Sequence, residues 1–535
     1  MYCELKINKT FLIGCMLGFA ILFSSCTTQK TYSPKVASGK YILTPKEKEE
    51  PQINGAAVFG VTPNAPFLYT IPATGVRPME FSVKNLPNGL QVNQETGVIS
   101  GQILDKKIGD HKVVLIAKNK VGVDQKEFNI KVGNTICLTP PLGWNSWNCW
   151  GPLVTQKNVI ESAEAMVAKG LNNYGWSYIN IDDAWQSKRG GKHHAILADE
   201  TKFPDMEGLS NQVHNMGLKL GIYSSPWVTT YAGYIGGTSD FEDGHWDQSM
   251  NDKNNRKKGE KRTFTRVANY TFDENDAKQW ADWGIDYLKY DWNPNEPAST
   301  IRMANALKNS GRDIIYSLSN TAPLENAALF GEVVNCFRTY GDLKDRWDGK
   351  GSHKSIRDEW IAHREWMEKG FSGAPGHFPD PDMLVVGDVN TKGGLHPSRL
   401  TADEQYAHVS LWSLWAAPML IGCPIETMDD FTLNLLTNAE VLAINQDEIA
   451  IPGKTIYHDA TMEIVVKELV DGSKALGLFN LKKESQTITV TWEDLGIKGS
   501  KELRDLWRQK DIGKYKETFS ATVPSHGVVL VKIKK

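Results

Sequence analysis

The stretch Asp-Trp-Gly-Ile-Asp-Tyr-Leu-Lys-Tyr-Asp (residues 282–291) contains the end of a helix, a stop signal and a short strand. Before it, Ala277, Trp280 and Ala281 recur at the spacing of one helix face. Gly284 indicates the end of that helix, and residues 285–288 indicate a strand that runs into Lys289-Tyr290-Asp291. Such a unit is typical of folds in which helices alternate with parallel strands.

The same unit recurs between residues 138 and 450. Helical spacing leads through Gly170 to a strand from Tyr178, and through Gly217 to a strand from Leu218. The expected strands are 142–145, 178–181, 218–222, 285–288, 314–318, 334–337, 383–386 and 419–421. About eight strands in roughly 300 residues predict a (β/α)8 TIM barrel. An open doubly wound sheet is disfavoured, because no glycine-rich phosphate loop follows an early strand.

Alternating apolar residues flank the barrel on both sides. Residues 51–134 contain short alternating runs separated by Pro87-Asn88-Gly89 and Glu95-Thr96-Gly97, which predicts a small β-sandwich. Residues 451–535 alternate again, and they predict a C-terminal antiparallel β-sandwich. The chain is therefore expected to be a multidomain protein with a central barrel.

The N-terminus is typical of an export signal. Lys6 and Lys9 precede an apolar run that ends in Ser24-Ser25-Cys26. This ending resembles a bacterial lipobox, so residues 1–25 are expected to be a lipoprotein signal peptide and Cys26 the lipidated residue. Residues 26–50 are polar and predict a tether. We expect a secreted protein held in the bacterial envelope by a lipid anchor, facing the periplasm or the outer surface; the alternative is an ordinary cleaved signal.

The composition excludes several classes of function. The 535 residues carry 60 Lys and Arg against 63 Asp and Glu, so no basic surface for nucleic acid is indicated. Cys137, Cys149, Cys336 and Cys423 remain after the expected signal and lipidated cysteine are set aside, with no CxxC and no histidine at metal spacing. No structural zinc, other metal or cofactor is expected. One disulfide is compatible with an oxidising compartment, but the sequence does not pair the four residues.

Charged and aromatic residues stand at the ends of the expected strands. Because the active sites of TIM barrels lie at the carboxyl ends of the strands, these residues should meet at one mouth. They are Trp144, Asp182, Asp183, Tyr223, Lys289, Asp291, Ser319, Arg338, Asp342 and Asp382. Carboxylates and cations that bind hydroxyls, together with aromatic rings, are the expected lining of a sugar pocket. Any one of these Asp residues could instead cap a helix, but that explanation is weak for the whole set.

Residues 138 to about 450 resemble glycoside hydrolase family 27, the α-galactosidase and α-N-acetylgalactosaminidase family. The motifs that carry the resemblance follow one another in the family's order and spacing. They are Pro-Pro-Leu-Gly-Trp-Asn-Ser-Trp (140–147), Ile-Asp-Asp-Ala-Trp (181–185), Gly-Leu-Lys-Leu-Gly-Ile-Tyr (217–223), the stretch 282–291, Arg-Thr-Tyr-Gly-Asp (338–342), Asp-Pro-Asp-Met-Leu (380–384) and Ile-Asn-Gln-Asp (444–447). Residues 51–134 likewise resemble the Ig-like domains that precede bacterial glycosidases.

The resemblance implies a retaining, exo-acting α-galactosidase that needs no cofactor and acts on oligosaccharides or polysaccharides with terminal α-galactose. It implies Asp291 as the nucleophile and Asp342 as the general acid and then base. We expect burial and neighbouring carboxylates to raise the pKa of Asp342 so that it is protonated at the start. Among the substrate-binding residues, the resemblance implies that Asp182 and Asp183 bind the 4- and 6-hydroxyls, that Trp144 and Tyr223 line the pocket, and that Arg338 reaches the 2-side with Asp342.

Substrate choice is left open by the loop at residues 316–322. Ser319 and Ala322 fit the pattern of enzymes that accept a 2-acetamido group, so N-acetylgalactosaminide is expected to be cleaved or tolerated. One alternative is therefore an α-N-acetylgalactosaminidase. A second is a β-L-arabinopyranosidase, whose sugar is galactose without C6 and would need the O6 side of the pocket closed. From another class, the alternative is a non-catalytic surface glycan-binding protein. The polar run 251–262, rich in Lys, Asp and Asn, is expected to be a solvated insertion that could rim the pocket.

Overall fold

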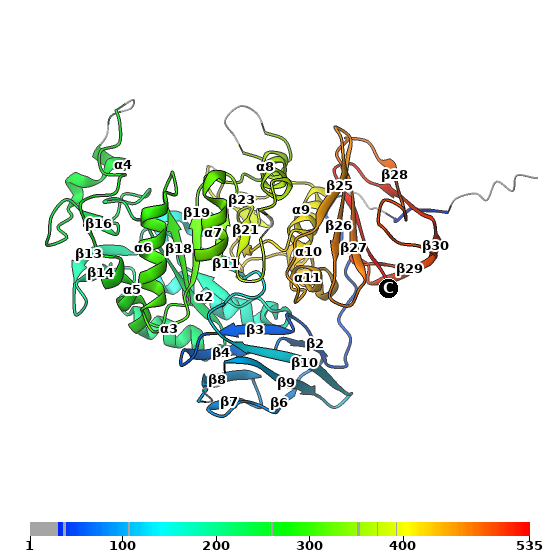
Figure 1. Cartoon of the computed structure of the whole chain (residues 1–535), viewed down its shortest axis with the longest axis horizontal. Coiled ribbons are helices and arrows are strands. Elements are labelled where there is room, and N and C mark those ends of the chain that lie inside the picture. Colours follow the sequence, from blue (N-terminus) through cyan, green and yellow to red (C-terminus); the bar gives the residue numbers. More distant parts are fainter. Residues whose placement is uncertain are drawn as a thin grey trace, which may run out of the picture.

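Eight parallel strands form the central sheet of the computed structural model, which describes residues 30–35, 39–104, 108–255, 257, 260–349, 354–371, 373–391 and 393–535 (Figure 1). In chain order they are β11 Leu142–Asn145, β12 Tyr178–Asn180, β15 Lys219–Ser224, β18 Tyr287–Asp291, β19 Ile315–Ser319, β20 Cys336–Arg338, β21 Phe378–Asp380 and β24 Met419–Ile421. A parallel bridge between Leu384 and Ile421 joins the two edges of the sheet. The predicted (β/α)8 barrel is confirmed.

Helices between the strands cover the outside of the barrel (Figure 1). They are α2 Gln156–Ala168, α3 Met206–Asn215, α5 Asp273–Asp282, α6 Pro297–Lys308, α7 Ala327–Val333, α8 Ile356–Glu368 and α9 Ala402–Leu414. Gly217 and Gly284 follow α3 and α5 with φ of 75° and 80°, a left-handed conformation that glycine adopts without strain. These glycines turn the chain from each helix into the next strand.

The seventh strand differs from the expected one. The sequence predicts a strand over residues 383–386, whereas β21 is Phe378–Asp380. Asp382 follows β21 in a turn with φ of 79°, and Leu384 makes only the single bridge to Ile421. The apolar residues 383–386 are buried in the barrel core without forming a regular strand, so their hydrophobicity reflects burial rather than strand pairing.

A β-sandwich with its own core lies below the barrel in Figure 1. One sheet contains β3 Val58–Val61, β6 Glu80–Lys84, β9 Gly109–Lys118 and β10 Val123–Val132; the other contains β4 Pro66–Thr70, β7 Leu90–Val92 and β8 Val98–Gln102. Every second residue of β9 from Val113 to Ala117 is buried, as alternation predicts. Thr62 and Thr70 connect this unit to the barrel, where the Thr62 N–H donates to Asp313 at 2.8 Å.

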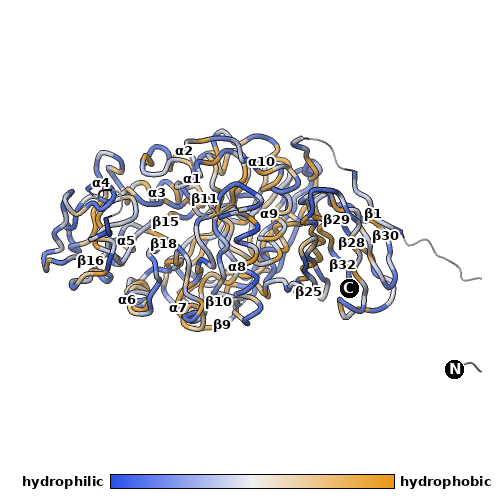
Figure 2. Tube along the Cα trace, turned by 90° about the horizontal axis from the view of Figure 1, so that it is seen from above, coloured by the Kyte–Doolittle hydropathy of each residue, from blue (hydrophilic) through white to orange (hydrophobic). Residues whose placement is uncertain are grey.

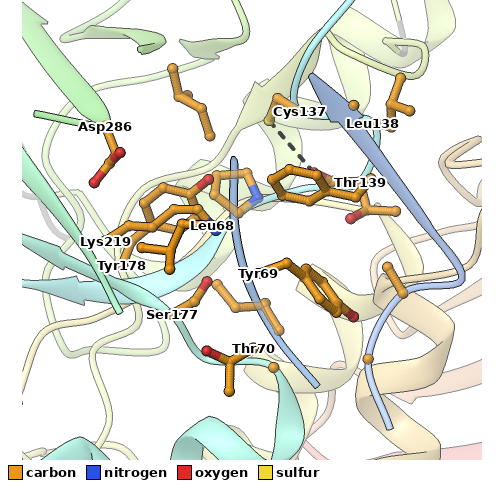
Figure 3. Close-up of a pocket in the computed structure, with 18 of the residues that line it drawn as sticks. Leu68, Tyr69, Thr70, Cys137, Leu138, Thr139, Ser177, Tyr178, Lys219 and Asp286 are labelled. Atoms are coloured by element: carbon orange, nitrogen blue, oxygen red, sulfur yellow. Dashed lines mark hydrogen bonds between the residues drawn. The ribbon is translucent and has the colours of Figure 1, made fainter. Parts of the chain in front are cut away.

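A small cavity of ≈120 Å³ lies at the junction between this sandwich and the floor of the barrel. Figure 3 shows the residues that line it. Tyr69 and Thr70 come from the sandwich, while Tyr178 and Lys219 come from the starts of barrel strands. The Lys219 ammonium lies 5.3 Å from the ring centroid of Tyr178. Burial lowers the pKa of Lys219 to about 8. This cavity lies at the end of the strands opposite to the predicted site.

The C-terminal strands form a second β-domain beside the barrel. Its sheets contain β25 Lys454–His458, β26 Met462–Glu468, β27 Lys474–Asn480, β29 Ser500–Asp505, β30 Lys510–Lys516 and β32 Val528–Ile533, and β28 Gln486–Thr491 with β31 Thr518–Val523. Strand β27 is buried on both faces because one face packs on α9. A Cβ at Gly477 would lie 2.6 Å from the Leu414 side chain of α9, so any larger residue here would have to displace that side chain. The barrel core therefore continues into the inner face of this domain.

The N-terminal segment differs from the expected tether. Residues 30–35 and 39–50, which we call the N-terminal strap, pack along the C-terminal domain and the barrel. Strand β1 Thr31–Tyr32 pairs in parallel with β31, and the Tyr32 hydroxyl donates to Asp505 at 2.6 Å. Further along, the Tyr41 hydroxyl donates to Asp403 of α9, and Tyr174 donates to Glu47 at 2.6 Å.

Asn438 connects the strap to both neighbouring domains. Its side-chain amide donates to the Thr44 hydroxyl at 2.9 Å and to the Leu506 carbonyl at 3.0 Å. Its side-chain oxygen accepts from the backbone of Glu440 and so caps helix α11 Ala439–Asn445. The expected signal peptide and the lipidated Cys26 lie outside the described residues. Among the described residues, no helix combines the length and apolarity that crossing a membrane would require.

Candidate active site

A pocket of ≈150 Å³ lies at the carboxyl ends of the barrel strands. Eight of the ten predicted site residues line it: Asp182, Asp183, Tyr223, Lys289, Asp291, Arg338, Asp342 and Asp382. Trp144 and Ser319 are not among its lining residues. The pocket also receives residues that the sequence analysis did not select: Trp147, Asn148, Tyr231, Asn320, Leu343, Lys344 and Met383.

Asp291 is the last residue of β18 and is held from two sides. The Tyr223 hydroxyl donates to one carboxylate oxygen at 3.1 Å, and the Asn320 amide donates to the other. Burial raises the pKa of Asp291 to about 6, while Lys289 and the Asn320 hydrogen bond oppose that rise. The side chain is thus fixed in orientation and is buried at the base of the pocket.

Lys289 lies two residues before Asp291 and points to the same face of β18. Its ammonium donates to Asp182 at 2.7 Å and lies 5.6 Å from the ring centroid of Tyr223. Burial alone would lower the pKa of Lys289, but the Asp182 and Asp291 carboxylates raise it above its ordinary value. Lys289 therefore stays charged between the two carboxylates.

Asp183 is buried behind the loop that follows β15. Its two oxygens accept from the Thr230 hydroxyl and from the Ala232 N–H, each at 2.8 Å. Burial raises the pKa of Asp183 to about 7 in spite of these hydrogen bonds. The same loop carries Tyr231 into the pocket, so the position of this ring depends on the Asp183 contacts.

Arg338, at the end of β20, joins two carboxylates of very different exposure. Its guanidinium lies 2.9 Å from the buried Asp382 and 3.6 Å from Asp342, whose side chain is 67% exposed. Partial desolvation favours a higher pKa for Asp342, but Arg338, Lys289 and Lys344 outweigh it and lower the pKa of this carboxyl. The expectation of a raised pKa is therefore wrong for the unliganded protein, because nearby cations dominate.

Two predicted pocket residues lie elsewhere. Trp144 is fully buried, and its indole donates to the Cys423 carbonyl at 3.0 Å. Trp147 lines the pocket instead. It lies three residues later and is the first residue of helix α1 Trp147–Trp150.

Ser319 ends β19 and is 3% exposed, whereas the next residue, Asn320, reaches the pocket. Asn320 has φ of 66°, a conformation that asparagine tolerates better than most residues.

The pocket combines chemistry that suits hydrolysis of a sugar bond. A buried carboxylate with a raised pKa and an exposed carboxylate with a lowered pKa line the same cavity, and three further carboxylates lie beside them. Among the described residues, no group of three or more His, Cys, Asp or Glu side chains could hold a metal ion.

Comparison with known families agrees with this geometry. The family model described as Alpha galactosidase A matches residues 139–250 and 256–447. The chain belongs to this family, glycoside hydrolase family 27. The model of the α-galactosidase C-terminal β-sandwich domain matches residues 459–533, and the He_PIG model of Ig domains matches residues 50–133. As a family 27 chain it is an enzyme of the α-galactosidase type.

Individual relatives cover most of the chain. α-Galactosidase 2 of Arabidopsis thaliana is 34% identical over 75% of this chain and 91% of its own length. The crystal structure of α-galactosidase I from Mortierella vinacea is 29% identical, with a TM-score of 0.62 over 74% of this chain and 97% of its own. A solved structure from Bacteroides fragilis NCTC 9343 is 31% identical, with a TM-score of 0.79 over 91% of this chain and 98% of its own.

We predict that Arg338→Met lowers the free energy of unfolding by about 3–5 kcal/mol, because Asp382 is left buried without its cation. The matched control is Asp342→Ala, which removes the exposed partner of the same arginine and should cost less than about 1 kcal/mol. Urea unfolding followed by tryptophan fluorescence measures both. Equal losses in the two variants would contradict the structural role given to the Arg338–Asp382 pair.

Proposed function

We propose that this protein is a retaining, exo-acting α-galactosidase in which Asp291 is the nucleophile and Asp342 is the general acid and base. Family membership supports the activity. The observation that carries the residue roles is the way Asp291 is held: both of its oxygens accept hydrogen bonds, and the side chain is buried in the pocket. A buried nucleophile that is reached through one pocket suits removal of a terminal sugar.

In the first step, an ionised Asp291 oxygen attacks the anomeric carbon and forms an ester. The glycosidic C–O bond breaks, and its oxygen takes the proton of Asp342 as the leaving group departs. Asp342 is suited to that side of the sugar because it lies at the exposed mouth of the pocket, where an aglycone must extend. Lys289 and Asp182 remain paired beside the ring and can bind its hydroxyls.

In the second step, Asp342 removes a proton from water, which attacks the same carbon and displaces Asp291. Ester formation has by then removed the negative charge of Asp291. Because that charge and Asp342 interact, its loss favours the ionised form of Asp342 that a base requires. Two inversions at one carbon release galactose with its α configuration retained.

The wild type is predicted to release α-galactose first from an aryl α-galactoside, and Asp291→Asn is predicted to lose activity by at least about 10³-fold, because an amide cannot form the ester. Proton NMR of the nascent sugar gives the anomer. A 2-fluorogalactoside that traps the ester, followed by peptide mapping, identifies the nucleophile. Release of β-galactose as the first product, or a label on a residue other than Asp291, would contradict the proposed mechanism.

The two carboxyl pKa values predict an unusual proton distribution. When the pair holds one proton, the raised pKa of Asp291 and the lowered pKa of Asp342 place it mainly on Asp291. The productive form, with the proton on Asp342, is then a minority. Loss of the last proton from the pair occurs near pH 6, so kcat/KM should fall above that pH.

Asn320→Gly tests this distribution. The Asn320 hydrogen bond lowers the pKa of Asp291, so its removal raises that pKa. The alkaline limb of kcat/KM should move to higher pH, while the plateau falls about threefold to tenfold because the proton stays on Asp291 more often. Asn64→Gly, at φ of 67° in the Ig-like unit, is the control for backbone effects. An alkaline limb that moves to lower pH would contradict the assignment.

Galactose is favoured over N-acetylgalactosamine at this pocket. The sequence pattern of Ser319 and Ala322 predicts an open 2-position, but both side chains are buried, at 3% and 2% exposure, and neither lines the pocket. Asn320 lines it instead and contacts the carboxylate that attacks C1, which adjoins C2. Its carboxamide therefore takes space that a 2-acetamido group would need.

In the wild type, kcat/KM for an aryl α-galactoside should accordingly be at least about tenfold higher than for the matching N-acetylgalactosaminide. The variant Asn320→Gly should lower this ratio of the two kcat/KM values. Ser319→Gly is the matched control, since it removes a side chain that does not reach the pocket, and it should leave the ratio within about twofold. Equal kcat/KM values for the two sugars in the wild type would contradict this preference and support a pocket with space for the 2-acetamido group.

A further inference from the structure

Three cationic side chains lie around the mouth of the pocket. Lys344 lines it directly. The Arg262 guanidinium lies 5.5 Å from the ring centroid of Tyr231, which also lines the pocket, and the Lys354 ammonium lies 3.5 Å from the ring centroid of Tyr340. Within the described part of the chain, none of the three cations lies within ion-pairing distance of a carboxylate, and two of them contact aromatic rings instead. A negatively charged ligand at the mouth would therefore meet cations that have no carboxylate partner of their own.

Two of these cations flank the loop that carries Asp342. Lys344 follows Asp342 by two residues, and its charge contributes to the lowered pKa of that carboxyl. Lys354 approaches Gly341 so closely that a Cβ there would lie 3.7 Å from the ammonium nitrogen. The proposed function places the departing aglycone beside Asp342. The two lysines therefore lie next to the leaving group rather than next to the galactose.

Arg262 comes from an insertion whose sequence is strongly basic. Residues 251–262 contain Lys253, Arg256, Lys257, Lys258, Lys261 and Arg262 against Asp252 and Glu260. In Figure 2, the described chain at helix α4 (Asp252–Asn255) lies at one end of the molecule and is coloured mainly as hydrophilic. The insertion is anchored near the pocket, because the Thr229 N–H donates to the Phe264 carbonyl at 3.1 Å.

Asp252 does not neutralise this basic segment. Its carboxylate accepts from the backbone of Thr263, Phe264 and Thr265, at 2.9, 2.6 and 2.9 Å, and so closes the base of the loop. The acidic residue is used for the loop's own structure, while Arg262 faces Tyr231. Cations thus lie beside the mouth of a pocket that is lined by five carboxylates.

A neutral aglycone gives these cations no partner, whereas an anionic one does. We propose that the leaving-group side of the pocket binds an anionic sugar, bearing a uronate carboxylate or a sulfate ester, so that the enzyme removes α-galactose from an acidic glycan. This inference rests on the proposed α-galactosidase function and deepens it by naming the class of the aglycone. Carboxylate and sulfate share the chemistry that Lys and Arg recognise.

An anionic aglycone would also assist the first chemical step. Its charge offsets the positive field of Lys344 and its neighbours at Asp342 and so raises the pKa of that carboxyl in the complex. More of the enzyme then carries the proton on Asp342, where the leaving oxygen needs it. An anionic substrate would thus shift the shared proton of the pair from Asp291 towards Asp342.

The test compares substrates that differ only in charge. One pair is α-galactosyl galacturonic acid and its methyl ester, and the other is α-galactosyl galactose with and without a 6-sulfate on the second sugar. At low ionic strength the wild type should show a kcat/KM roughly tenfold higher for the anionic member of at least one pair, the sum of two or three exposed ion pairs. The two arms tell carboxylate from sulfate, and about 0.5 M salt should reduce the ratio towards one.

The variant Arg262→Gln/Lys344→Gln/Lys354→Gln should lower the ratio to about one, while Lys498→Gln, an exposed lysine of the C-terminal domain, should leave it unchanged. The salt dependence of the wild type provides the same test if the triple variant folds poorly. A ratio of one or less in both arms at low salt, or a preference that survives the triple substitution, would overturn the inference. Cleavage of neutral galactosides without an anionic preference would overturn this inference alone; no cleavage of any member would overturn the proposed function with it.

Discussion

The pocket depends on two buried cations that lie among five carboxylates. Lys289 pairs with Asp182 and Arg338 pairs with Asp382, at 2.7 and 2.9 Å. Without these pairs, burial would drive the carboxyl groups towards their neutral forms or open the strand ends to water. Because both cations sit at the ends of barrel strands, the parallel sheet fixes where they can stand. The charge distribution of the site is therefore a consequence of the fold.

That distribution separates the two carboxyl groups proposed for the chemistry. Asp291 is buried and loses solvation, so its pKa rises to about 6; Asp342 is exposed and faces three cations, so its pKa falls. When the unliganded pair holds one proton, that proton therefore lies mainly on Asp291, whereas the proposed mechanism needs it on Asp342. A bound substrate would favour the form with the proton on Asp342 by displacing water from that carboxyl or by bringing negative charge near Lys344. Binding and protonation are linked in this site.

The sequence predicted the elements that follow periodicity and missed those set by turns. The repeated unit of helix, glycine and strand predicted the barrel, and the strand ends predicted the positions of Lys289 and Asp291, since residues two apart share a face.

Trp147 and Asn320 were missed because each lies just past its strand, where local φ and ψ decide the direction of the side chain. The lowered pKa of Asp342 was missed because Arg338, Lys289 and Lys344 together outweigh desolvation, and no motif records how close their charges come to this carboxyl. The strap was missed because a polar composition does not show that Tyr32, Tyr41 and Thr44 find hydrogen-bond partners hundreds of residues away.

The strap changes how the domains relate to one another. The Ig-like unit lies against the floor of the barrel, opposite to the pocket, and the strap reaches the C-terminal domain first. It then passes α9 and meets the Ig-like unit, where the Val76 N–H donates to the Glu49 carbonyl at 3.0 Å. One segment therefore bonds to all three domains, and Asn438 ties it to the helix cap of α11 and to the C-terminal domain. Since the inner face of the C-terminal domain also completes the barrel core, the barrel is held from two sides and its strand ends are supported in place. The precise spacing that the pocket needs is thus maintained by segments that contribute no side chain to it.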